Sequence, residues 1–532
     1  MSTTGLDADV QVYDTTLRDG AQQEGLSLSV ADKLAIAGHL DELGVGFIEG
    51  GWPGANPKDT EFFARAATEL DLRSASLAAF GATRRAGARA GDDPQVRALL
   101  DAATPVVTLV AKSHSRHVEL ALRTTGAENL AMVADTVGLL VAEGRRVFLD
   151  AEHFFDGYRA DPAYALEVVR TAAEAGAEAV VLCDTNGGML PHQIEVAVAE
   201  VLEATGARLG AHMHNDTGCA VANSLAAVRA GATHVQGCLN GYGERTGNAD
   251  LVTVVADLVL KMGRPVLARE RLREATRIAH QVSEITNYPP YARAPYVGAS
   301  AFAHKAGLHA SAIRVDPDLY QHADPTDVGN DMRMLVSDMA GRASIELKGR
   351  ELGFDLAGRD DVLARVTARV KDLELQGWTF ESADASFELL LREEVEGARP
   401  QFFEVESWRA LTEHGRGTGP TSEATVKIVA AGERVVCTGE GNGPVNALDA
   451  ALRQALRQVY PQLAHFELTD FRVRILDADQ GTDATTRVLI DTTDGQHTWT
   501  TVGVAPNLVE ASWQALVDGL TYGLLRSGAQ HA

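Results

Sequence analysis

The first half of the chain alternates short β-rich runs with longer amphipathic stretches, and this alternation constrains the fold more than any other feature. The β-rich runs cover residues 10–13, 45–51, 75–80, 105–110, 146–152, 179–185, 208–214 and 233–240. Between them lie helical patterns such as ADKLAIAGHLDELG, which end near a glycine, as helices often do. Eight βα units in roughly 250 residues have the size of a (β/α)8 TIM barrel. An open doubly wound sheet is the alternative, but no GxGxxG follows the first strand, and eight regular units favour closure.

We therefore predict an α/β protein in which residues 1–275 form a (β/α)8 catalytic barrel. The composition changes after this point, because ITNYPPYARAPYVGAS is rich in proline and glycine and is typical of a connector. A helical pattern follows over residues 342–375. We assign residues 276–395 to helical linker subdomains that contribute to the active site.

The tail, residues 396–532, has a different pattern. Three β-rich runs followed by a helical run occur twice, and the helical runs are PVNALDAALRQAL and NLVEASWQALVDGLTYGLL. A small-residue turn precedes each helical run, Gly443-Pro444 in the first and Ala505-Pro506 in the second. This duplicated βββα unit predicts a compact C-terminal α+β domain that is separate from the barrel.

Charge and cysteine content restrict the possible partners and the compartment. The formal net charge of −25 argues against nucleic acid or an anionic membrane surface as a partner. The four cysteines are widely spaced and form no CxxC pair, which suits a reducing cytosol better than a disulfide framework. The N-terminus lacks a signal-peptide pattern, and no apolar run is long enough to span a bilayer. We expect a cytoplasmic protein.

Polar residues gather where the predicted strands end. In a (β/α)8 barrel these ends converge on one mouth, where catalysis takes place. The residues are Asp14, Arg18 and Asp19 after the first strand, Glu49 after the second, Glu152 and His153 after the fifth, Asp184 and Thr185 after the sixth, His212 and His214 at the seventh, and Glu244, Arg245 and Asn248 after the eighth.

The motif AHMHNDTG, residues 211–218, predicts a metal site at this mouth. Residues i and i+2 of a strand share a face, so His212 and His214 point the same way. Two imidazoles and a carboxylate from another strand suit a divalent cation, and the absence of thiolates favours a catalytic metal over a closed structural zinc site. Two such histidines alone are more often core or loop residues. With Asp19 and Asn248 available at the same mouth, the metal site becomes the better interpretation.

Arg18 and its neighbours have both structural and catalytic interpretations. An Arg-Asp pair such as Arg18 and Asp19 is most often a structural ion pair. Beside a cation, however, the Arg18 guanidinium can bind a carboxylate or stabilise a developing oxyanion. Glu152, His153 and Thr185 can serve as a network that orients the metal ligands.

These motifs together resemble a known enzyme superfamily. They are YDTTLRDGAQ, GGWPGANPKD, AEHFFDGY, CDTNGG, HMHNDTG, NGYGERTGN and FAHKAGLH. The chain is similar over nearly its whole length to the metal-dependent acyltransferases and lyases that include 2-isopropylmalate, homocitrate and citramalate synthases. IEGGWPGANPKD and EHFFDGY are most similar to the (R)-citramalate synthase branch. The βββα repeat resembles the regulatory dimerisation domain of the same enzymes.

The resemblance implies a ligand set. Asp19, His212 and His214 match the metal ligands, and Asn248 matches a position that some members use for metal. The cation implied is Mn²⁺ or Mg²⁺, with Zn²⁺ or Co²⁺ as alternatives.

The resemblance also implies catalytic roles. Arg18 matches the catalytic arginine, and Glu152 and Thr185 match residues that line the keto-acid site. His309 matches the catalytic histidine of the subdomain after the barrel, and Tyr320 matches a tyrosine near it. If the alignment shifts by five residues, His304 takes the place of His309.

The implied reaction is a Claisen-type condensation of acetyl-CoA with pyruvate that yields (R)-citramalate and CoA, at the entry to isoleucine biosynthesis. Metal and Arg18 would stabilise the developing alkoxide, and His309 is the candidate base, coupled to Glu152 or Tyr320. The resemblance further implies a homodimer, with isoleucine as an effector at the C-terminal domain.

Three alternatives remain open on the sequence. The same chemistry can act on a larger 2-oxo acid, as in 2-isopropylmalate or homocitrate synthesis, since each methylene changes discrimination by only about 1–3 kcal/mol. A Schiff-base aldolase on the same barrel would need a desolvated lysine, for which Lys112 is the candidate. A metabolite sensor with an inactive barrel is the third, and the complete set of Arg18, Asp19, His212 and His214 argues against it.

Overall fold

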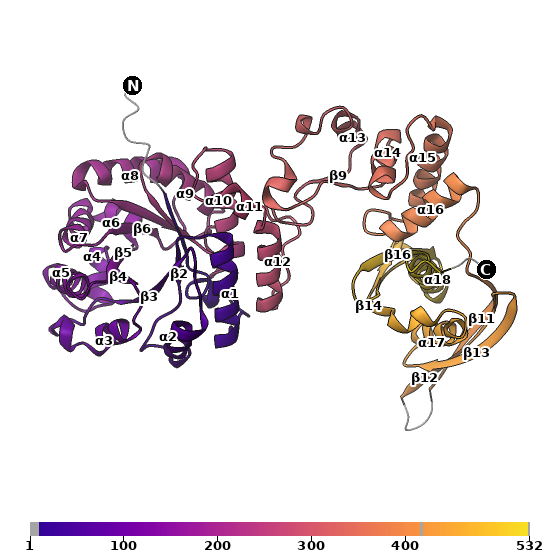
Figure 1. Cartoon of the computed structure of the whole chain (residues 1–532), viewed down its shortest axis with the longest axis horizontal. Helices are drawn as coiled ribbons and strands as arrows, with labels where there is room; N and C mark the ends of the chain where they lie inside the picture. The colour runs from indigo at the N-terminus through magenta and orange to yellow at the C-terminus, as the bar shows by residue number, and fades with distance from the viewer. Residues whose placement is uncertain (1–9, 415–418, 530–532) are drawn as a thin grey trace. The chain divides into compact units, whose positions relative to one another are not determined.

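The computed structural model describes residues 10–414 and 419–529 (Figure 1). It divides the chain into two compact units. The first comprises residues 1–302 and 323–331, and the second comprises residues 303–322 and 332–532. None of the helices in the described ranges is long and apolar enough to cross a membrane.

The first unit is a closed barrel of eight parallel strands, each paired with its neighbours in chain order. The strands are β1 (Gln11–Asp14), β2 (Phe47–Glu49), β3 (Ser76–Ala82), β4 (Val106–Lys112), β5 (Arg146–Glu152), β6 (Ala179–Asp184), β7 (Leu209–Met213) and β8 (His234–Gly237). Pairing of β8 with β1, where Gln11 lies opposite His234, closes the barrel. The predicted barrel is confirmed, and the open sheet is excluded.

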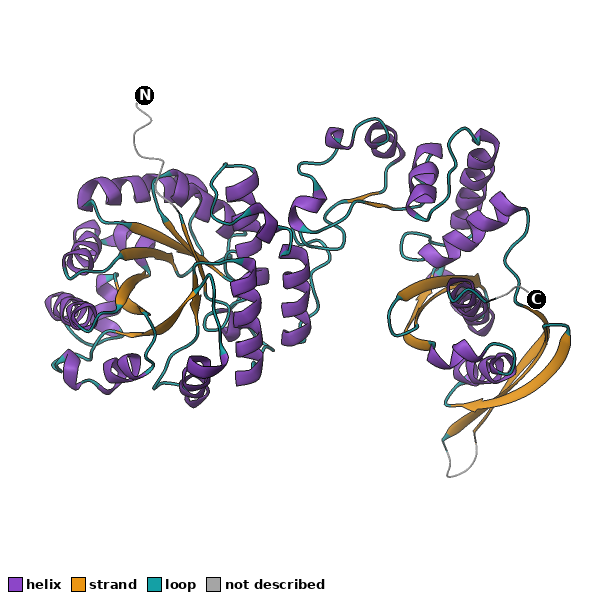
Figure 2. Cartoon of the chain, in the orientation of Figure 1, coloured by secondary structure: helices purple, strands orange, loops and turns teal. Residues whose placement is uncertain are grey.

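Helices surround the strands, as Figure 2 shows in purple around the orange barrel. They are α1 (Val30–Leu43), α2 (Pro57–Glu69), α3 (Pro94–Asp101), α4 (Ser115–Leu120), α5 (Gly126–Ala142), α6 (Phe154–Ala160), α7 (Pro162–Glu174), α8 (Pro191–Thr205), α9 (Ala220–Arg229), α10 (Leu251–Leu260), α11 (Arg269–Leu272) and α12 (Ala275–Thr286). Local sequence fixes their ends. At α1, Ser29 and Asp32 form a capping box, and Gly44 adopts the left-handed conformation after the last turn.

The interior of the barrel divides into an apolar and a polar part. One buried cluster comprises Tyr13, Phe47, Ala78, Val106, Phe148 and Ala179, which come from six strands at or near their N-terminal ends. Aromatic rings pack there edge to face and offset, with Phe47 and Phe148 centroids 5.1 Å apart. This layer fills the half of the barrel interior at the N-terminal ends of the strands. The inward-facing residues at the carboxyl ends of the strands can therefore be polar.

The second unit begins with a short strand pair and helices. These elements are β9 (Ala303–His304), α13 (Gly307–Ile313), β10 (Arg333–Met334), α14 (Arg342–Glu351), α15 (Asp360–Leu375) and α16 (Asp384–Glu396). The helical pattern predicted over 342–375 is therefore two helices, α14 and α15. They are separated at Gly353, which has a φ of 86° that favours glycine.

The tail confirms the predicted duplication. The first repeat is β11 (Phe403–His414), β12 (Pro420–Ala430), β13 (Glu433–Gly441) and α17 (Pro444–Arg457). The second is β14 (Glu467–Ile475), β15 (Thr486–Thr493), β16 (Thr498–Ala505) and α18 (Leu508–Arg526). Each repeat is a three-stranded antiparallel sheet with its helix packed on it. Gly439 in β13 and Gly503 in β16 occupy the same place in the two repeats. A Cβ on either would lie less than 3 Å from helix backbone.

Candidate active site at the barrel mouth

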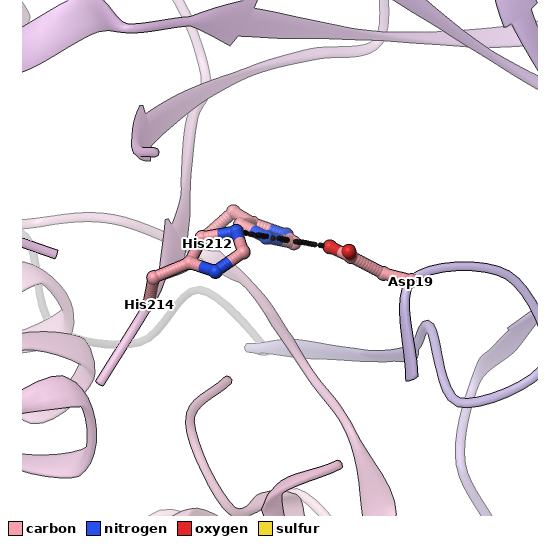
Figure 3. A group of neighbouring side chains, drawn as sticks. All are labelled: Asp19, His212 and His214. Carbon is pink, nitrogen blue, oxygen red and sulfur yellow. Dashed lines mark hydrogen bonds and ion pairs between the residues drawn. The ribbon is translucent and has the colours of Figure 1, made fainter. Parts of the chain in front are cut away.

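Three potential metal-ligand atoms meet at the carboxyl ends of the strands (Figure 3). The Nε2 atom of His212 lies 3.1 Å from Oδ2 of Asp19. It lies 3.3 Å from Nε2 of His214, and the third edge of the triangle, from His214 Nε2 to Asp19 Oδ2, is 3.9 Å. All three side chains are buried. The cluster joins the loop after β1 to the end of β7.

The end of β7 differs slightly from the predicted strand. The strand stops at Met213, and His214 forms an isolated bridge with Asn248 instead of a further ladder position. The two imidazoles still converge, because the backbone remains extended long enough to keep i and i+2 on one side.

The donor geometry fits a divalent cation. Ligand distances of about 2.1 Å put adjacent ligands of an octahedral ion about 3.0 Å apart, close to two of the three edges observed. Asn248 offers a further donor, because its Oδ1 is buried without a hydrogen-bond partner while its Nδ2 donates to the Tyr242 carbonyl at 3.2 Å. Nitrogen and oxygen donors without thiolate match the predicted catalytic type of site.

Electrostatics keep Asp19 and His214 in the forms that bind metal, whereas His212 shares a proton with Asp19. Burial alone would raise the pKa of Asp19, but Arg18 and His212 outweigh it and hold that pKa well below the usual range. Burial, together with the neighbouring His212, lowers the pKa of His214 to about 4, so this imidazole is neutral at neutral pH. Burial would also lower the pKa of His212, but its hydrogen bond to Asp19 and the charge of that carboxylate raise it.

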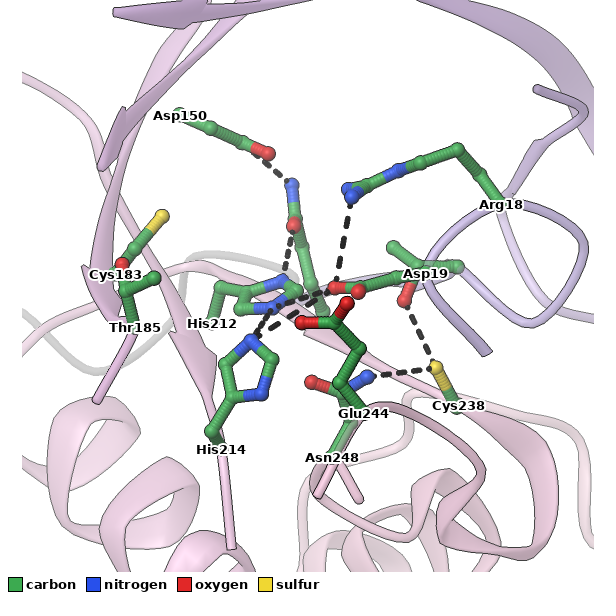
Figure 4. Close-up of polar contacts among 12 residues, drawn as sticks. Arg18, Asp19, Asp150, Cys183, Thr185, His212, His214, Cys238, Glu244 and Asn248 are labelled. Carbon is green, nitrogen blue, oxygen red and sulfur yellow. Dashed lines mark hydrogen bonds and ion pairs between the residues drawn. The ribbon is translucent and has the colours of Figure 1, made fainter. Parts of the chain in front are cut away.

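Arg18 lies beside this cluster and is held in one orientation (Figure 4). Its Nε donates to Oε2 of Glu49 at 2.5 Å, and its guanidinium carbon lies 3.8 Å from the centre of the Phe80 ring. Its NH1 lies 3.6 Å from Asp19 Oδ2. The chain therefore positions a guanidinium over the site with its terminal nitrogens near the metal-ligand carboxylate.

Glu49 supports Arg18 and also has a partner on β1. It is fully buried at the end of β2, where it accepts from the Tyr13 hydroxyl at 2.8 Å as well as from Arg18. Burial would lower the pKa of Arg18, but the charges of Glu49 and Asp19 outweigh it and raise that pKa. Arg18 is thus charged and fixed before any substrate arrives.

Glu152 and Thr185 line the same cavity, which has a volume of about 290 Å³. Glu152 forms an ion pair with Lys112, the last residue of the preceding strand β4. The Thr185 hydroxyl accepts from the backbone N–H of His153 at 2.8 Å. Lys112, the candidate for a Schiff-base lysine, is therefore engaged by a carboxylate.

His309 and Tyr320 belong to the second unit. Their rings stack with centroids 4.1 Å apart, and His304 lies edge-on to His309 at 6.2 Å. His309 sits in α13, whereas Tyr320 follows a short turn that begins at Pro317. The structure brings these two side chains together across eleven residues of sequence.

Sequence reasoning missed several residues that shape the site. Trp52 and Phe80 form apolar parts of the cavity wall, and Asp150 and Cys183 line its interior. Gln236 bridges Asp150 and His212. Asp150 and Gln236 lie inside strands, two positions before Glu152 and two before Cys238, so only the period-2 alternation of inward-facing residues could have signalled them.

Three family models match consecutive parts of the chain. The HMGL-like model matches residues 9–279, the model described as the homocitrate synthase post-HMGL domain matches residues 296–377, and the LeuA allosteric (dimerisation) domain model matches residues 381–524. The first covers the barrel and its site, and the last covers the βββα repeat.

Full-length relatives are similar in sequence. The chain is 67% identical to the (R)-citramalate synthase of Streptomyces coelicolor, with 100% of this chain and 99% of that protein covered. It is 49% identical to the (R)-citramalate synthase of Synechocystis, with 96% of each covered. It is 47% identical to that of Aquifex aeolicus, with 97% and 98% covered. On this full-length similarity and the matching barrel, the chain belongs to the (R)-citramalate synthase family of HMGL-like enzymes.

Proposed function

We propose that this enzyme condenses acetyl-CoA with pyruvate and water to give (R)-citramalate and CoA. The observation that carries the proposal is the buried cluster of Asp19, His212 and His214 beside Arg18 in one cavity. The full-length relatives named (R)-citramalate synthase support the same substrates.

A divalent cation, Mn²⁺ or Mg²⁺ in our proposal, would be held by Asp19, His212 and His214, with Asn248 as a further donor. Zn²⁺ or Co²⁺ are alternatives. When bound, such an ion supplies Lewis-acid polarisation of a keto group.

Arg18 would bind the oxygen that becomes negative when the new carbon–carbon bond forms. Its Nε is already engaged by Glu49, and its stacking on Phe80 restricts rotation, so the terminal nitrogens are preorganised. Preorganised donors of this kind lower the barrier because they need no reorientation in the transition state. In the same step the pyruvate carboxylate would lie within the positive field of the guanidinium.

A base must remove a methyl proton from acetyl-CoA so that the resulting carbanion can attack the keto carbon. His309 is our candidate, with Tyr320 stacked on it. The keto oxygen then takes up a proton, and water hydrolyses the thioester to release CoA. A histidine suits this role because its ordinary pKa lies near neutrality.

Apolar side chains form part of the cavity wall. Trp52 and Phe80 pack edge to face with ring centroids 5.3 Å apart, and Val110 lies on the next strand. They line a cavity of about 290 Å³, and in our proposal the methyl group of pyruvate lies against them. The larger acids used in 2-isopropylmalate or homocitrate synthesis are the alternative substrates.

The tail would regulate this activity. The match to the LeuA allosteric (dimerisation) domain supports a homodimer and an effector site. Isoleucine is our candidate effector, because citramalate formation would then be the entry step of isoleucine biosynthesis. We place the enzyme in the cytoplasm, where acetyl-CoA and pyruvate are available.

The proposal is tested by incubating purified enzyme with acetyl-CoA and pyruvate and by identifying the product by chiral chromatography. We expect (R)-citramalate. Treatment with borohydride and pyruvate separates this mechanism from the Schiff-base alternative, because an imine with Lys112 would be trapped. Irreversible inactivation by borohydride, or a product other than citramalate, would contradict the proposal.

A further inference from the structure

A buried chain of two hydrogen bonds leads from Asp150 to the metal-ligand histidine His212 (Figure 4). Oε1 of Gln236 lies 2.8 Å from Nδ1 of His212, and Nε2 of Gln236 donates to Oδ1 of Asp150 at 3.0 Å. Gln236 is fully buried, and Asp150 and His212 are 3% and 4% exposed. No step described so far uses Gln236 or Asp150.

The chemistry of the three groups fixes the direction of both bonds. A carboxylate accepts hydrogen bonds, so Asp150 orients the Gln236 amide with its nitrogen toward the acid and its oxygen toward His212. The amide oxygen can only accept, so Nδ1 of His212 must carry the proton. In a neutral imidazole the other nitrogen, Nε2, then presents a lone pair, and this is the atom that faces Asp19 and His214.

We propose that Gln236, oriented by Asp150, is a positioning residue that fixes the Nε2 lone pair of His212 toward the metal site. The inference rests on the proposed metal site and deepens it. Partners of this kind on the second ring nitrogen of a metal-ligating histidine hold its tautomer and ring orientation. Without the bridge, the ring is free to rotate and to carry its proton on Nε2, where it opposes a cation.

The opposite end of the barrel supplies a matched control. There Oε1 of Gln11 lies 3.1 Å from Nδ1 of His234, and Nε2 of Gln11 donates to Glu178 at 3.0 Å. This bridge has the same three chemical groups, joins β1 to β8 and is remote from the cluster of Asp19, His212 and His214. A general effect of removing a glutamine bridge from the barrel would appear in both places, whereas tautomer control of the metal site belongs to Gln236 alone.

The test measures Mn²⁺ binding to the full-length protein after a chelator has stripped it of metal. Electron paramagnetic resonance of free Mn²⁺ gives the dissociation constant without any substrate. We expect Gln236→Met, which keeps the length of the side chain, to weaken Mn²⁺ binding by about 10–100-fold. Gln11→Met should bind Mn²⁺ as the unaltered protein does, and thermal unfolding of each metal-free variant reports the structural effect separately.

A second pair of variants keeps the test decisive if Gln236→Met does not fold. Asp150→Asn can donate as well as accept, so it no longer dictates the amide orientation, and we expect weaker Mn²⁺ binding. In Asp150→Asn with Gln236→Glu, the new carboxylate accepts from both neighbours, and His212 again donates from Nδ1. We expect this double variant to recover most of the affinity that Asp150→Asn loses.

Unchanged Mn²⁺ affinity in Gln236→Met and Asp150→Asn would overturn the inference, as would an equal loss in Gln11→Met. A loss that the double variant does not reverse would also count against it. If the unaltered protein itself binds no Mn²⁺, the proposed metal site fails first, and this result is distinct from a failure of the positioning role.

Discussion

Arg18 is held by two different contacts, and we expect another cation at this position to lose both. Glu49 fixes its Nε, and Phe80 offers a flat surface for the planar guanidinium. A lysine at this position keeps the charge but has neither the fork of donors nor the planar group. A lysine at position 18 therefore tests the orientation of the cationic group while its charge is kept.

We expect Arg18→Lys to lower kcat by about 10²–10³-fold, which is the typical cost of one lost oxyanion donor. Mn²⁺ affinity should remain close to that of the unaltered enzyme, because the metal donors stay in place. Steady-state kinetics beside a Mn²⁺ binding isotherm check this expectation. A kcat near the unaltered value would show that Arg18 does not contact the reacting oxygen.

For single residues, the sequence identifies a functional side chain when both the residue type and its position at a strand end indicate chemistry. Asp19, His212 and His214 satisfy both conditions, and the structure brings them together. Gln236 and Phe80 satisfy neither, because an amide or a ring inside a buried strand is ordinarily a packing residue. Their roles depend on partners that are distant in sequence, and only the folded barrel brings those partners into contact.

Among the elements, the barrel strands follow the sequence closely because parallel strands buried on both faces are near-continuous apolar runs. The predicted bounds coincide with those of β5, whereas the predicted run 233–240 begins one residue before β8 and ends three residues after it. Prediction was weaker for the helices of the second unit, since the break between α14 and α15 depends on Gly353 and not on a change in hydrophobic pattern. Sheet pairing in the tail was implied only by the duplication.

The N-terminal half of the barrel contains a histidine that makes stability depend on pH. Burial, together with the charges of Arg208 and Arg146 and against that of Glu178, lowers the pKa of His234 to about 3. The folded state keeps this ring neutral, whereas the unfolded chain binds a proton below its ordinary pKa of 6.5. Stability from this group is therefore complete above about pH 6.5 and is lost progressively as the pH falls toward 3.

We expect the free energy of unfolding of the barrel to fall by up to about 2 kcal/mol between pH 7 and pH 5 through this group. His234→Phe keeps an aromatic ring beside Tyr13 and Phe148 and should lack this contribution. Urea unfolding of both proteins across this range gives the difference. Parallel pH curves for the two proteins would contradict the assignment.

In the tail, the approach of a strand to its helix depends on glycine. A Cβ at Gly503 would lie 2.0 Å from the Ala511 carbonyl oxygen and 2.9 Å from the Ala515 nitrogen. We expect Gly503→Val to destabilise the tail by about 1–3 kcal/mol or more, because α18 must move away from β16. Gly443→Ala is the control, since a Cβ there meets nothing within 4 Å.

Calorimetry of the full chain is the measurement for Gly503→Val, with Mn²⁺ binding as the indicator of an intact barrel. The tail transition should move to lower temperature and the metal affinity should stay unchanged. An unchanged tail transition would mean that α18 is not held as closely as the structure indicates.

For the whole molecule, α16 links two cores of the second unit. Phe387 and Leu391 pack into the helical core, whereas Ala385 and Leu389 pack into the core of the βββα repeat. Glu388 also accepts from the Tyr522 hydroxyl of α18 at 2.9 Å. Removing the tail after residue 395 would therefore expose an apolar face of α16, so regulation is better studied with the intact chain.

The match to a dimerisation domain gives a prediction for the intact chain. Light scattering coupled to gel filtration should give twice the chain mass of 56.6 kDa at micromolar concentration. Isoleucine should lower the activity without dissociating the dimer. A monomeric mass with full activity would show that the active enzyme does not need a dimer formed by the tail.

The central claim is that the barrel mouth carries out a metal-dependent condensation on a small keto acid. CoA release from acetyl-CoA, measured with pyruvate, 2-oxoisovalerate and 2-oxoglutarate in parallel, tests it most directly. Each acid is assayed with a chelator and again after Mn²⁺ or Mg²⁺ is restored. We predict turnover with pyruvate that the chelator abolishes and the metal restores. Turnover that survives the chelator, or that prefers a larger keto acid, would contradict the account.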